Sequence, residues 1–272
     1  FPVPLWLGAE PVKDKAVLLH SEQGLGDAIQ FCRYAKLVAD LGARVILEVP
    51  GPLLSLLHCL DGVAQFVEAG MPLPAFDYHC PLMSLPLAFK TTLDTIPASK
   101  TYLSSNKSGV DYWAGKLGTK TRPRIGLVWS GRPEHKNDHH RSLALDPLLP
   151  YLPHDFEYVS LQKELRDADR AALEQSSIKY FGDQLNDFAD TAALCELMDA
   201  VVSVDTSVAH LAGALGKKTW VLLPDVPDWR WLLDRDDSPW YPSIKLYRQE
   251  RIGDWTGALE RVRVDLAALA RQ

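Results

Sequence analysis

The sequence predicts an α/β protein built from two doubly wound units, each a parallel sheet with helices on both faces. Apolar runs typical of buried strands alternate with helical segments along almost the whole chain, and one stretch rich in Ser, Lys and Gly, residues 97–121, interrupts the alternation. At 272 residues and 47% hydrophobic, the chain is long enough to bury one large core or two ordinary ones. Ligands of such folds bind beyond the carboxyl ends of the parallel strands, so we expect a cleft between the two units at that edge.

Four strands and two helices are expected in the first unit. The strands are Ala16–His20, Arg44–Val49, Ala64–Glu68 and Asp77–Cys80, and the helices are Asp27–Leu41 and Gly51–Leu60. The first helix is predicted because Phe31, Ala35 and Val38 recur on one face. Gly42 is a typical left-handed stop after it.

The alternation restarts in the second unit with "RIGLVWSG" at 124–131. Further strands are expected at 156–162, 178–182, 200–205, 218–224 and 244–249, with helical segments between most of them. A segment rich in Trp, Pro and Asp precedes the last of these strands, and a helix from about Thr256 to Arg271 closes the chain.

Composition and charge exclude several classes of partner. The net charge is -6 and the basic residues are scattered, so the chain has no electrostatic footprint for nucleic acid or for an anionic membrane. No apolar stretch approaches the ~18 residues of a membrane span, and no signal peptide precedes the first strand. The four cysteines lie far apart, which favours reduced thiols and a cytoplasmic location.

The stretch "SEQGLGDAIQF", which links the first strand to the first helix, admits two interpretations. Gly24 and Gly26 match the first two glycines of the dinucleotide-binding pattern GxGxxG, and Glu48 lies where its ribose-binding acid would be. Ile29 replaces the third glycine, and a branched side chain there would crowd a pyrophosphate. The alternative is a tight turn that presents the Asp27 carboxylate to the cleft as a general base, or that uses it only as a helix cap.

A second turn, in "SVDTSVAHLAGALGKKTWVLLP", offers a site for an anion. Asp205, Thr206 and Ser207 stand at the start of a helix that ends at Gly216. Free N–H groups, the helix dipole and two hydroxyls attract an anion there without any basic side chain. His210, one turn into the helix, is placed to donate a hydrogen bond to a phosphate oxygen. Ordinary helix capping and a structural histidine are the alternatives.

The polar loop after the strand at 124–131 is a second place where a phosphate would be met. Ser130 and Gly131 permit close approach of a ligand, and Arg141 offers a fork of donors to a diphosphate. Three histidines lie in the same loop, but no carboxylate or cysteine cluster accompanies them at a ligand spacing, so no metal is expected.

Two further groups of residues lie near the expected cleft. Gln162 and Lys163 follow the strand at 156–162, where a base or ribose would bind, and a solvated strand end is the alternative. Trp229, Trp231 and Trp240 lie in the segment rich in Trp and Pro. They either frame a sugar or form a rigid core plug between the units.

The stretches "EQGLGDAIQF…RY", "GLVWSG…N…RS", "SLQK" and "VDTSVAHLAGALGKKTWVLLP", followed by "DWRWLL…SPWYPS", together resemble a known domain. It is the glycosyltransferase-like domain at the C-terminus of many bacterial tetratricopeptide-repeat proteins. That domain is similar to the family-9 glycosyltransferases, the ADP-heptose:lipopolysaccharide heptosyltransferases. The resemblance runs from about Trp6 to about Trp255, and "LWLG" near its start looks like the seam that follows the repeats.

The resemblance implies a GT-B fold, in which two Rossmann-like doubly wound domains face each other across a cleft. Residues 1–107 would form the acceptor-side domain and residues 108–255 the nucleotide-sugar donor domain. Residues 256–272 would form a closing helix that packs back on the N-terminal domain.

The resemblance also implies an inverting, metal-independent transferase without a cofactor. Asp27 would be the base, and Arg141 would join the helix start in holding the donor phosphates, a group made up of Asp205, Thr206, Ser207 and His210. Ser207 stands where the family has glycine, so its side chain would narrow the phosphate pocket. The implied partners are a nucleotide-sugar donor, an acceptor that is a saccharide, lipid-linked saccharide or protein, and upstream tetratricopeptide repeats.

Two rival functions stay open on the sequence. One is a non-catalytic, degenerate GT-B module that retains a nucleotide pocket, or only the fold, and serves as a protein-interaction domain. Ser207 and the smaller first unit favour this alternative. The other is a dinucleotide-dependent oxidoreductase, which needs a ligand at Gly24 and Gly26 with Glu48 on the ribose.

Overall fold

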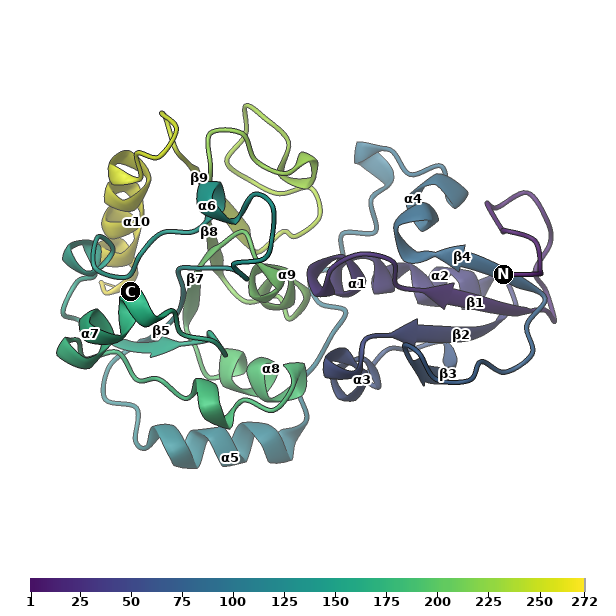
Figure 1. Cartoon of the computed structure of the whole chain (residues 1–272), viewed down its shortest axis with the longest axis horizontal. Coiled ribbons are helices and arrows are strands. Elements are labelled where there is room, and N and C mark those ends of the chain that lie inside the picture. Colours follow the sequence, from purple (N-terminus) through teal and green to yellow (C-terminus); the bar gives the residue numbers. More distant parts are fainter. Residues whose placement is uncertain (272) are drawn as a thin grey trace.

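The computed structural model describes residues 1–271 as two α/β units that lie side by side, each with a parallel sheet (Figure 1). The strands of the first unit have the order β3-β2-β1-β4, and those of the second unit have the order β6-β5-β7-β8-β9. All neighbouring strands in both sheets pair in parallel. In the first unit the strands are β1 (Ala16–His20), β2 (Arg44–Val49), β3 (Val63–Glu68) and β4 (Tyr78–Pro81). In the second unit they are β5 (Arg124–Val128), β6 (Glu157–Ser160), β7 (Ala200–Val204), β8 (Thr219–Leu223) and β9 (Ile244–Arg248).

Helices connect the strands in both units. The α-helices of the first unit are α1 (Leu25–Phe31), α2 (Ala35–Asp40), α3 (Gly51–Leu57) and α4 (Leu85–Ala88). The others are α5 (Lys107–Leu117), α6 (Asp138–Arg141), α7 (Asp167–Gln175), α8 (Phe188–Glu196), α9 (Ser207–Ala214) and α10 (Thr256–Leu269). Short 3-10 turns lie at Cys32–Tyr34, Leu82–Ser84, Leu93–Thr95, Leu149–Tyr151, Gly182–Gln184 and Trp229–Trp231.

The strand orders place a switch point in each sheet, where the chain leaves in opposite directions from two neighbouring strands. In the first sheet the switch point lies between β1 and β4, and in the second it lies between β5 and β7. Ligands of open parallel sheets bind just outside the carboxyl ends of the strands at such points. The turns after β1, β5 and β7 are therefore the parts of the fold that position a site.

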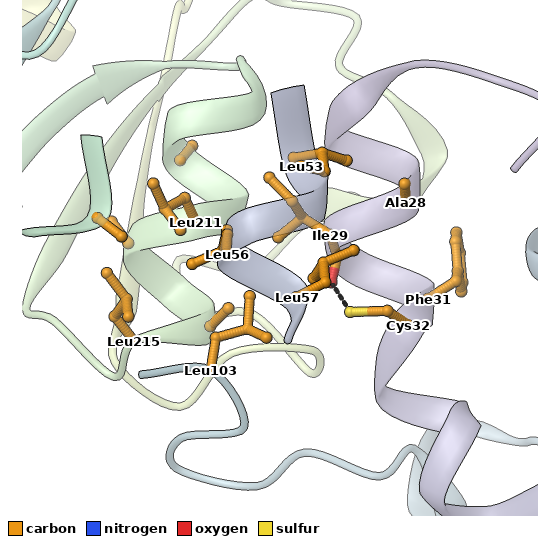
Figure 2. Close-up of a cluster of buried hydrophobic side chains, with 14 of the residues drawn as sticks. Ala28, Ile29, Phe31, Cys32, Leu53, Leu56, Leu57, Leu103, Leu211 and Leu215 are labelled. Atoms are coloured by element: carbon orange, nitrogen blue, oxygen red, sulfur yellow. Dashed lines mark hydrogen bonds between the residues drawn. The ribbon is translucent and has the colours of Figure 1, made fainter. Parts of the chain in front are cut away.

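An apolar cluster runs without a break from one unit into the other. It contains Val17 and Leu47 from the first sheet together with Leu211 and Val221 from the second unit. Figure 2 shows its centre, where side chains of α1 and α3 meet those of α9. Ile29 of α1 is fully buried there, beside Leu53, Leu57 and Leu211 (Figure 2). The contact between the units is thus built like a core.

Arg33 adds a polar tie to this apolar contact. Its side chain is 6% exposed and donates hydrogen bonds to the Gln30 carbonyl at 2.7 Å, the Trp240 carbonyl at 2.7 Å and the Tyr102 hydroxyl at 2.9 Å. The guanidinium also lies 4.6 Å from the centre of the Tyr241 ring. One buried side chain therefore joins α1 to the chain that links the units and to the loop before β9.

The closing helix corrects the sequence-based expectation. Residues 256–272 were expected to pack back on the first domain, but α10 packs on the second sheet, against β8, β9 and the turn at Leu149–Tyr151. Its buried Ala258, Leu259, Val262 and Leu266 belong to the cluster of Ile125 and Trp220. Figure 1 shows α10 on the side of the second unit that faces away from the first. The apolar stripe of the helix is satisfied by its own unit, while the domain boundary at residue 107 stays a prediction.

The expected strand at 178–182 does not form. This stretch makes only a single bridge, between Lys179 and Val159.

The expectation of helices on both faces also fails for part of the first sheet. One face carries a small cluster of Ala16, Leu18, Ile46 and Val67, and the side chains packed on it are Leu73 and Phe76, which lie outside any helix or strand. The sequence pattern shows that a face is apolar, but not whether a helix or a loop covers it.

Three of the four cysteines, Cys32, Cys80 and Cys195, are buried, and Cys59 is exposed. Within residues 1–271, no helix combines the length and the apolar character needed to cross a bilayer.

Candidate functional site

The turn after β1 holds Asp27 in place. Gly24 is the N-cap of α1, and its N–H donates a hydrogen bond to Asp27 Oδ2 at 2.8 Å. This is the carboxylate half of a capping box, in which an acid at the third helical position reaches back to the cap. The capping interpretation of Asp27 is therefore confirmed for one carboxylate oxygen, and the other oxygen is left for a second partner.

Gly26 lets this turn touch the start of α9. A Cβ at Gly26 would lie 2.8 Å from His210 Cδ2 and 3.4 Å from Ser207 Cα, the first of which real Cβ atoms do not tolerate. The missing side chain at Gly26 is what allows the two units to approach here. The turn that carries Asp27 and the turn that carries Ser207 are thus neighbours, as a shared site requires.

The start of α9 has no side-chain cap. Thr206 is its N-cap residue, and its side chain makes no capping hydrogen bond. The Thr206 hydroxyl lies 3.3 Å from Ser203 Oγ instead. The first N–H groups of a helix without such a cap carry the positive end of the helix dipole and need an external acceptor. Oxygen atoms of a phosphate are suitable acceptors.

His210 and Asp205 are buried beside this helix start. Nδ1 of His210 is 2.9 Å from the Tyr241 hydroxyl, and its ring stacks on Trp231 at 5.3 Å between centroids. Burial, followed by the charges of Arg230, Arg33 and Arg141, lowers the pKa of His210 to about 3. Burial raises the pKa of Asp205 to about 6, and Asp228 adds to this. At neutral pH His210 is therefore uncharged, and Asp205 is an anion in an unfavourable place.

Arg141 bridges the switch point of the second sheet. Its Nη1 donates to the Asp205 carbonyl at 2.8 Å, which joins the loop after β5 to the turn after β7. A Cβ at Gly131 would lie 2.6 Å from Arg141 Nη2, so this glycine makes room for the guanidinium. The structure thus brings Gly131 and Arg141 together with Asp205, Thr206 and the rest of the helix start.

Gln162 fixes the start of this loop through hydrogen bonds to Trp129 and Ser130. The Gln162 side-chain oxygen accepts hydrogen bonds from the N–H groups of Trp129 at 2.7 Å and Ser130 at 2.9 Å. Its Nε2 donates to Ser130 Oγ and to the Glu164 carbonyl, both at 3.2 Å. Both ends of the buried Gln162 amide have hydrogen-bond partners within the protein. Gln162 therefore supports the loop after β5.

Lys163 lies apart from the other candidate residues. It is exposed, and its Nζ donates to the Asn186 carbonyl at 3.0 Å, just before α8. Because β6 is the edge strand of the second sheet, its end is two strands away from Thr206. The structure does not bring Lys163 to the helix start.

Arg230 is the residue that sequence reasoning missed. Its guanidinium contacts Asp27 Oδ1 and donates to Asp228 Oδ1 at 2.7 Å, while the residue is only 7% exposed. It lies 4.7 Å from the centre of the Trp229 ring. The one available signal was an arginine flanked by two tryptophans in "DWRWLL", a composition unusual for a solvated loop. The segment at 228–231 therefore reaches from the second unit to the candidate base.

Arg230 Nε is a buried donor at this site that has no hydrogen-bond partner among the described residues. Arg141 Nε and Trp231 Nε1 make no hydrogen bond either, but each has a carboxylate near it, Asp138 at 3.6 Å from Arg141 Nε and Asp205 near Trp231. Buried donors without a partner are uncommon and mark strain or a site that a water or a ligand can use. Two cavities, of 320 and 540 Å³, lie away from this site, one between β8, β9 and α10 and the other between α6 and Trp255. The core-plug interpretation fits Trp231 and Trp240, which are buried, whereas Trp229 is 54% exposed.

The metal and dinucleotide interpretations find little support in these contacts. Across residues 1–271, His, Cys, Asp and Glu side chains nowhere gather in a group of three that would hold a metal ion. Metal independence itself stays a prediction. Ile29, at the position of the third glycine of the dinucleotide pattern, is buried between α1, α3 and α9 (Figure 2).

The chain has the α/β fold with two parallel sheets that is found in solved heptosyltransferases. The structure of ADP-heptose lipopolysaccharide heptosyltransferase II from E. coli aligns with a TM-score of 0.60 at 14% identity, over 94% of this chain and 99% of that one. The family-9 glycosyl transferase from Veillonella parvula aligns with a TM-score of 0.67 at 10% identity, over 96% and 98%.

In sequence, no family model matches the chain. It is similar to the protein FlbA of Caulobacter vibrioides, at 23% identity over 298 aligned residues. The alignment covers 97% of this chain and 48% of FlbA, so the chain spans about half the length of this relative.

Proposed function

We propose that this chain is an inverting, metal-independent glycosyltransferase that uses a nucleotide-diphosphate sugar, in the manner of a heptosyltransferase. The observation that carries the proposal is the meeting of two turns from different units. The turn that carries Asp27 touches the uncapped start of α9 at Gly26, Arg230 contacts the Asp27 carboxylate, and Arg141 holds the Asp205 carbonyl just before α9. The E. coli enzyme with the same fold is named for ADP-heptose, which supports a nucleotide-sugar donor.

In the proposed reaction the donor diphosphate binds at Thr206, with its oxygens accepting from the free N–H groups of α9 and from Arg141. An acceptor hydroxyl attacks the anomeric carbon from the opposite face and gives its proton to Asp27. The bond between that carbon and the phosphate oxygen breaks, and the nucleoside diphosphate leaves with the electron pair. Fixed N–H dipoles and guanidinium groups stabilise the charge that grows on the leaving group without having to reorganise. In this proposal the acceptor binds between the units, next to the first sheet.

The test is transfer or slow hydrolysis with a panel of ADP-, GDP- and UDP-sugars that includes ADP-heptose. Asp27→Asn keeps the hydrogen bond from Gly24 but cannot take up a proton at neutral pH. Loss of a general base costs about 100-fold or more in turnover. Asp265→Asn, which removes a carboxylate bound by Lys245 on the far side of the second unit, is the matched control. Turnover of Asp27→Asn within about threefold of the wild type would show that Asp27 is not the base.

A degenerate binding module is the second candidate, and one observation favours it. Arg230 contacts the oxygen of Asp27 that would accept the proton, and Trp231 stacks on His210. If these contacts are permanent, the chain retains the fold without the chemistry. A chain of this kind shows no turnover with any sugar of the panel, whether or not it binds ADP.

A further inference from the structure

Arg230 binds the Asp27 carboxylate, which is the base of the proposed function, yet one N–H group of Arg230 has no hydrogen-bond acceptor. It contacts Asp27 with one terminal nitrogen and Asp228 with the other, and its Nε has no acceptor although the side chain is 8% exposed. A guanidinium has five N–H donors in a fixed fork and binds best to planar or bidentate oxygen pairs. Two carboxylates that each give one oxygen do not use this fork fully.

The surroundings of Arg230 suit an anion. Arg230 is near enough to Asp205 and His210 to shift the pKa of both, which places its charge beside the start of α9. Trp231, which is fully buried, makes no hydrogen bond through Nε1 although the Asp205 carboxylate lies near it, and Thr206 leaves the helix uncapped. Two arginines, a helix start and the unpaired Nε of Arg230 therefore gather at one place, which suits an anion.

We infer that Arg230 is an exchangeable ligand of the donor diphosphate: Asp27 holds it in the free protein, and it passes to the diphosphate when the donor binds. The inference rests on the proposed function and concerns the control of its base. The diphosphate of a nucleotide sugar carries two negative charges and several acceptor oxygens, whereas Asp27 offers one charge. Exchange of partners satisfies Nε and at the same moment frees Oδ1 of Asp27. Asp228 keeps the guanidinium tethered during the exchange.

This arrangement couples two events. Before the donor binds, both carboxylate oxygens of Asp27 have donors, Oδ2 from the Gly24 N–H and Oδ1 from Arg230, so neither is open to an acceptor hydroxyl. After the donor binds, Asp27 faces the acceptor. Binding of the diphosphate and release of Asp27 are then linked, so any change that frees Arg230 in advance strengthens diphosphate binding.

The test is calorimetric titration of ADP, GDP and UDP into the wild type, Asp27→Asn, Arg230→Gln and the double variant. Asp27→Asn removes the competitor of the diphosphate, so the tightest of these nucleotides binds about threefold to tenfold more tightly. Arg230→Gln removes a charged donor, so that nucleotide binds about tenfold to 100-fold more weakly. The double variant binds like Arg230→Gln, because Asp27 acts on binding only through Arg230.

The matched control is again Asp265→Asn, which removes one carboxylate remote from the site and leaves nucleotide affinity unchanged. If Arg230→Gln unfolds, Arg230→Lys replaces it. Lysine keeps the charge and loses the fork, so binding weakens by about threefold to tenfold. Unchanged binding in that variant contradicts the inference.

The two proposals fail in different ways. If the wild type binds a nucleotide but Asp27→Asn binds it no more tightly, the exchange is refuted and the transferase proposal stands. If the wild type binds none of the three nucleotides, the proposed function fails and the exchange fails with it.

Discussion

The two turns of the candidate site have the same local topology and opposite chemistry. In each, a buried parallel strand runs through a short turn into a helix, β1 into α1 and β7 into α9. Neither start has a side-chain cap, since Gly24 has no side chain and the Thr206 hydroxyl makes no capping hydrogen bond. The difference is an acid: the first turn of α1 carries Asp27, which accepts from the Gly24 N–H, whereas the first turn of α9 carries none. The N–H groups at the start of α9 are therefore open to an anion, whereas a carboxylate already stands at the start of α1.

The two turns share one architecture but contribute opposite charges to the candidate site. The first turn contributes negative charge through the Asp27 carboxylate, and the start of α9 contributes the positive end of a helix dipole. Arg141, from the loop after β5, and Arg230, from the loop after β8, add positive charge near this helix start. The opposite charges lie close together because the units meet at Gly26, where there is no room for a side chain between the two turns. Each of the following changes either breaks this contrast or makes it sharper.

The largest expected effect is at the contact itself. Gly26→Ala places a Cβ 2.8 Å from His210 Cδ2, and His210 cannot move away because it is stacked on Trp231 and bonded to Tyr241. Overpacking of this kind destabilises by about 2–3 kcal/mol. Gly24→Ala is the control, since its Cβ would meet only Asp27 Oδ2 at 3.2 Å and costs under about 1 kcal/mol. Urea denaturation of both variants measures the difference, and equal midpoints would contradict the contact.

The next effect is on the pH dependence of stability. Asp205 has a pKa raised to about 6 by burial, so between about pH 4 and 6 the folded chain binds more protons at this site than the unfolded chain. This group therefore makes stability fall as the pH rises through that window. Asp205→Asn removes the penalty and stabilises the chain above pH 6 by about 2 kcal/mol.

His210 acts in the opposite direction, which provides an internal check. Its pKa is lowered to about 3, so the unfolded chain binds more protons from about pH 6.5 down to 3, and stability is lost as the pH falls. In the wild type the two slopes oppose each other between about pH 4 and 6. In Asp205→Asn only the histidine slope remains, and the acid limb of the stability curve becomes steeper. An unchanged acid limb would show that Asp205 titrates normally.

A smaller effect separates the two helix starts. Asp27→Ala removes the acceptor for the Gly24 N–H, so it is less stable than Asp27→Asn by about 1 kcal/mol. Thr206→Ala at the start of α9 costs less than about 0.5 kcal/mol, because its hydroxyl caps nothing. Thermal melts of the three variants test the contrast. A large loss in Thr206→Ala would mean that α9 is capped after all.

The smallest effect concerns Ser207. It stands where the resembling family has glycine, and its side chain adds bulk at the start of α9. Ser207→Gly is expected to tighten ADP binding by about threefold, at a cost of a few tenths of a kcal/mol in helix stability. Titration of ADP measures this, and weaker binding would show that the serine hydroxyl itself contacts the phosphate.

Much of the fold could be predicted from the sequence because burial in a parallel sheet leaves a strong local pattern. The strands Ala16–His20 and Arg44–Val49 agree with the structure to the residue, since both lie between turn signals and are apolar on both faces. The segment 178–182 looks similar but has one bridge only, because pairing depends on a neighbour that the local pattern does not contain.

The candidate site could be predicted only in part, for the same reason. Asp27, Thr206 and Arg141 follow strands, and the carboxyl ends of parallel strands share an edge, so their convergence is a consequence of topology. Lys163 also follows a strand, but β6 lies at the sheet edge. Arg230 lies in a long loop after β8, and its contact with Asp27 arises from the packing of one unit on the other. Helix caps are local, whereas contacts between units are not.

Arg33 ties three separate parts of the chain together. It joins α1, the chain between the units and the loop before β9 at a single buried point. Loss of this one side chain would leave the carbonyls of Gln30 and Trp240 without the donor that they share, so a single substitution would loosen all three segments at once.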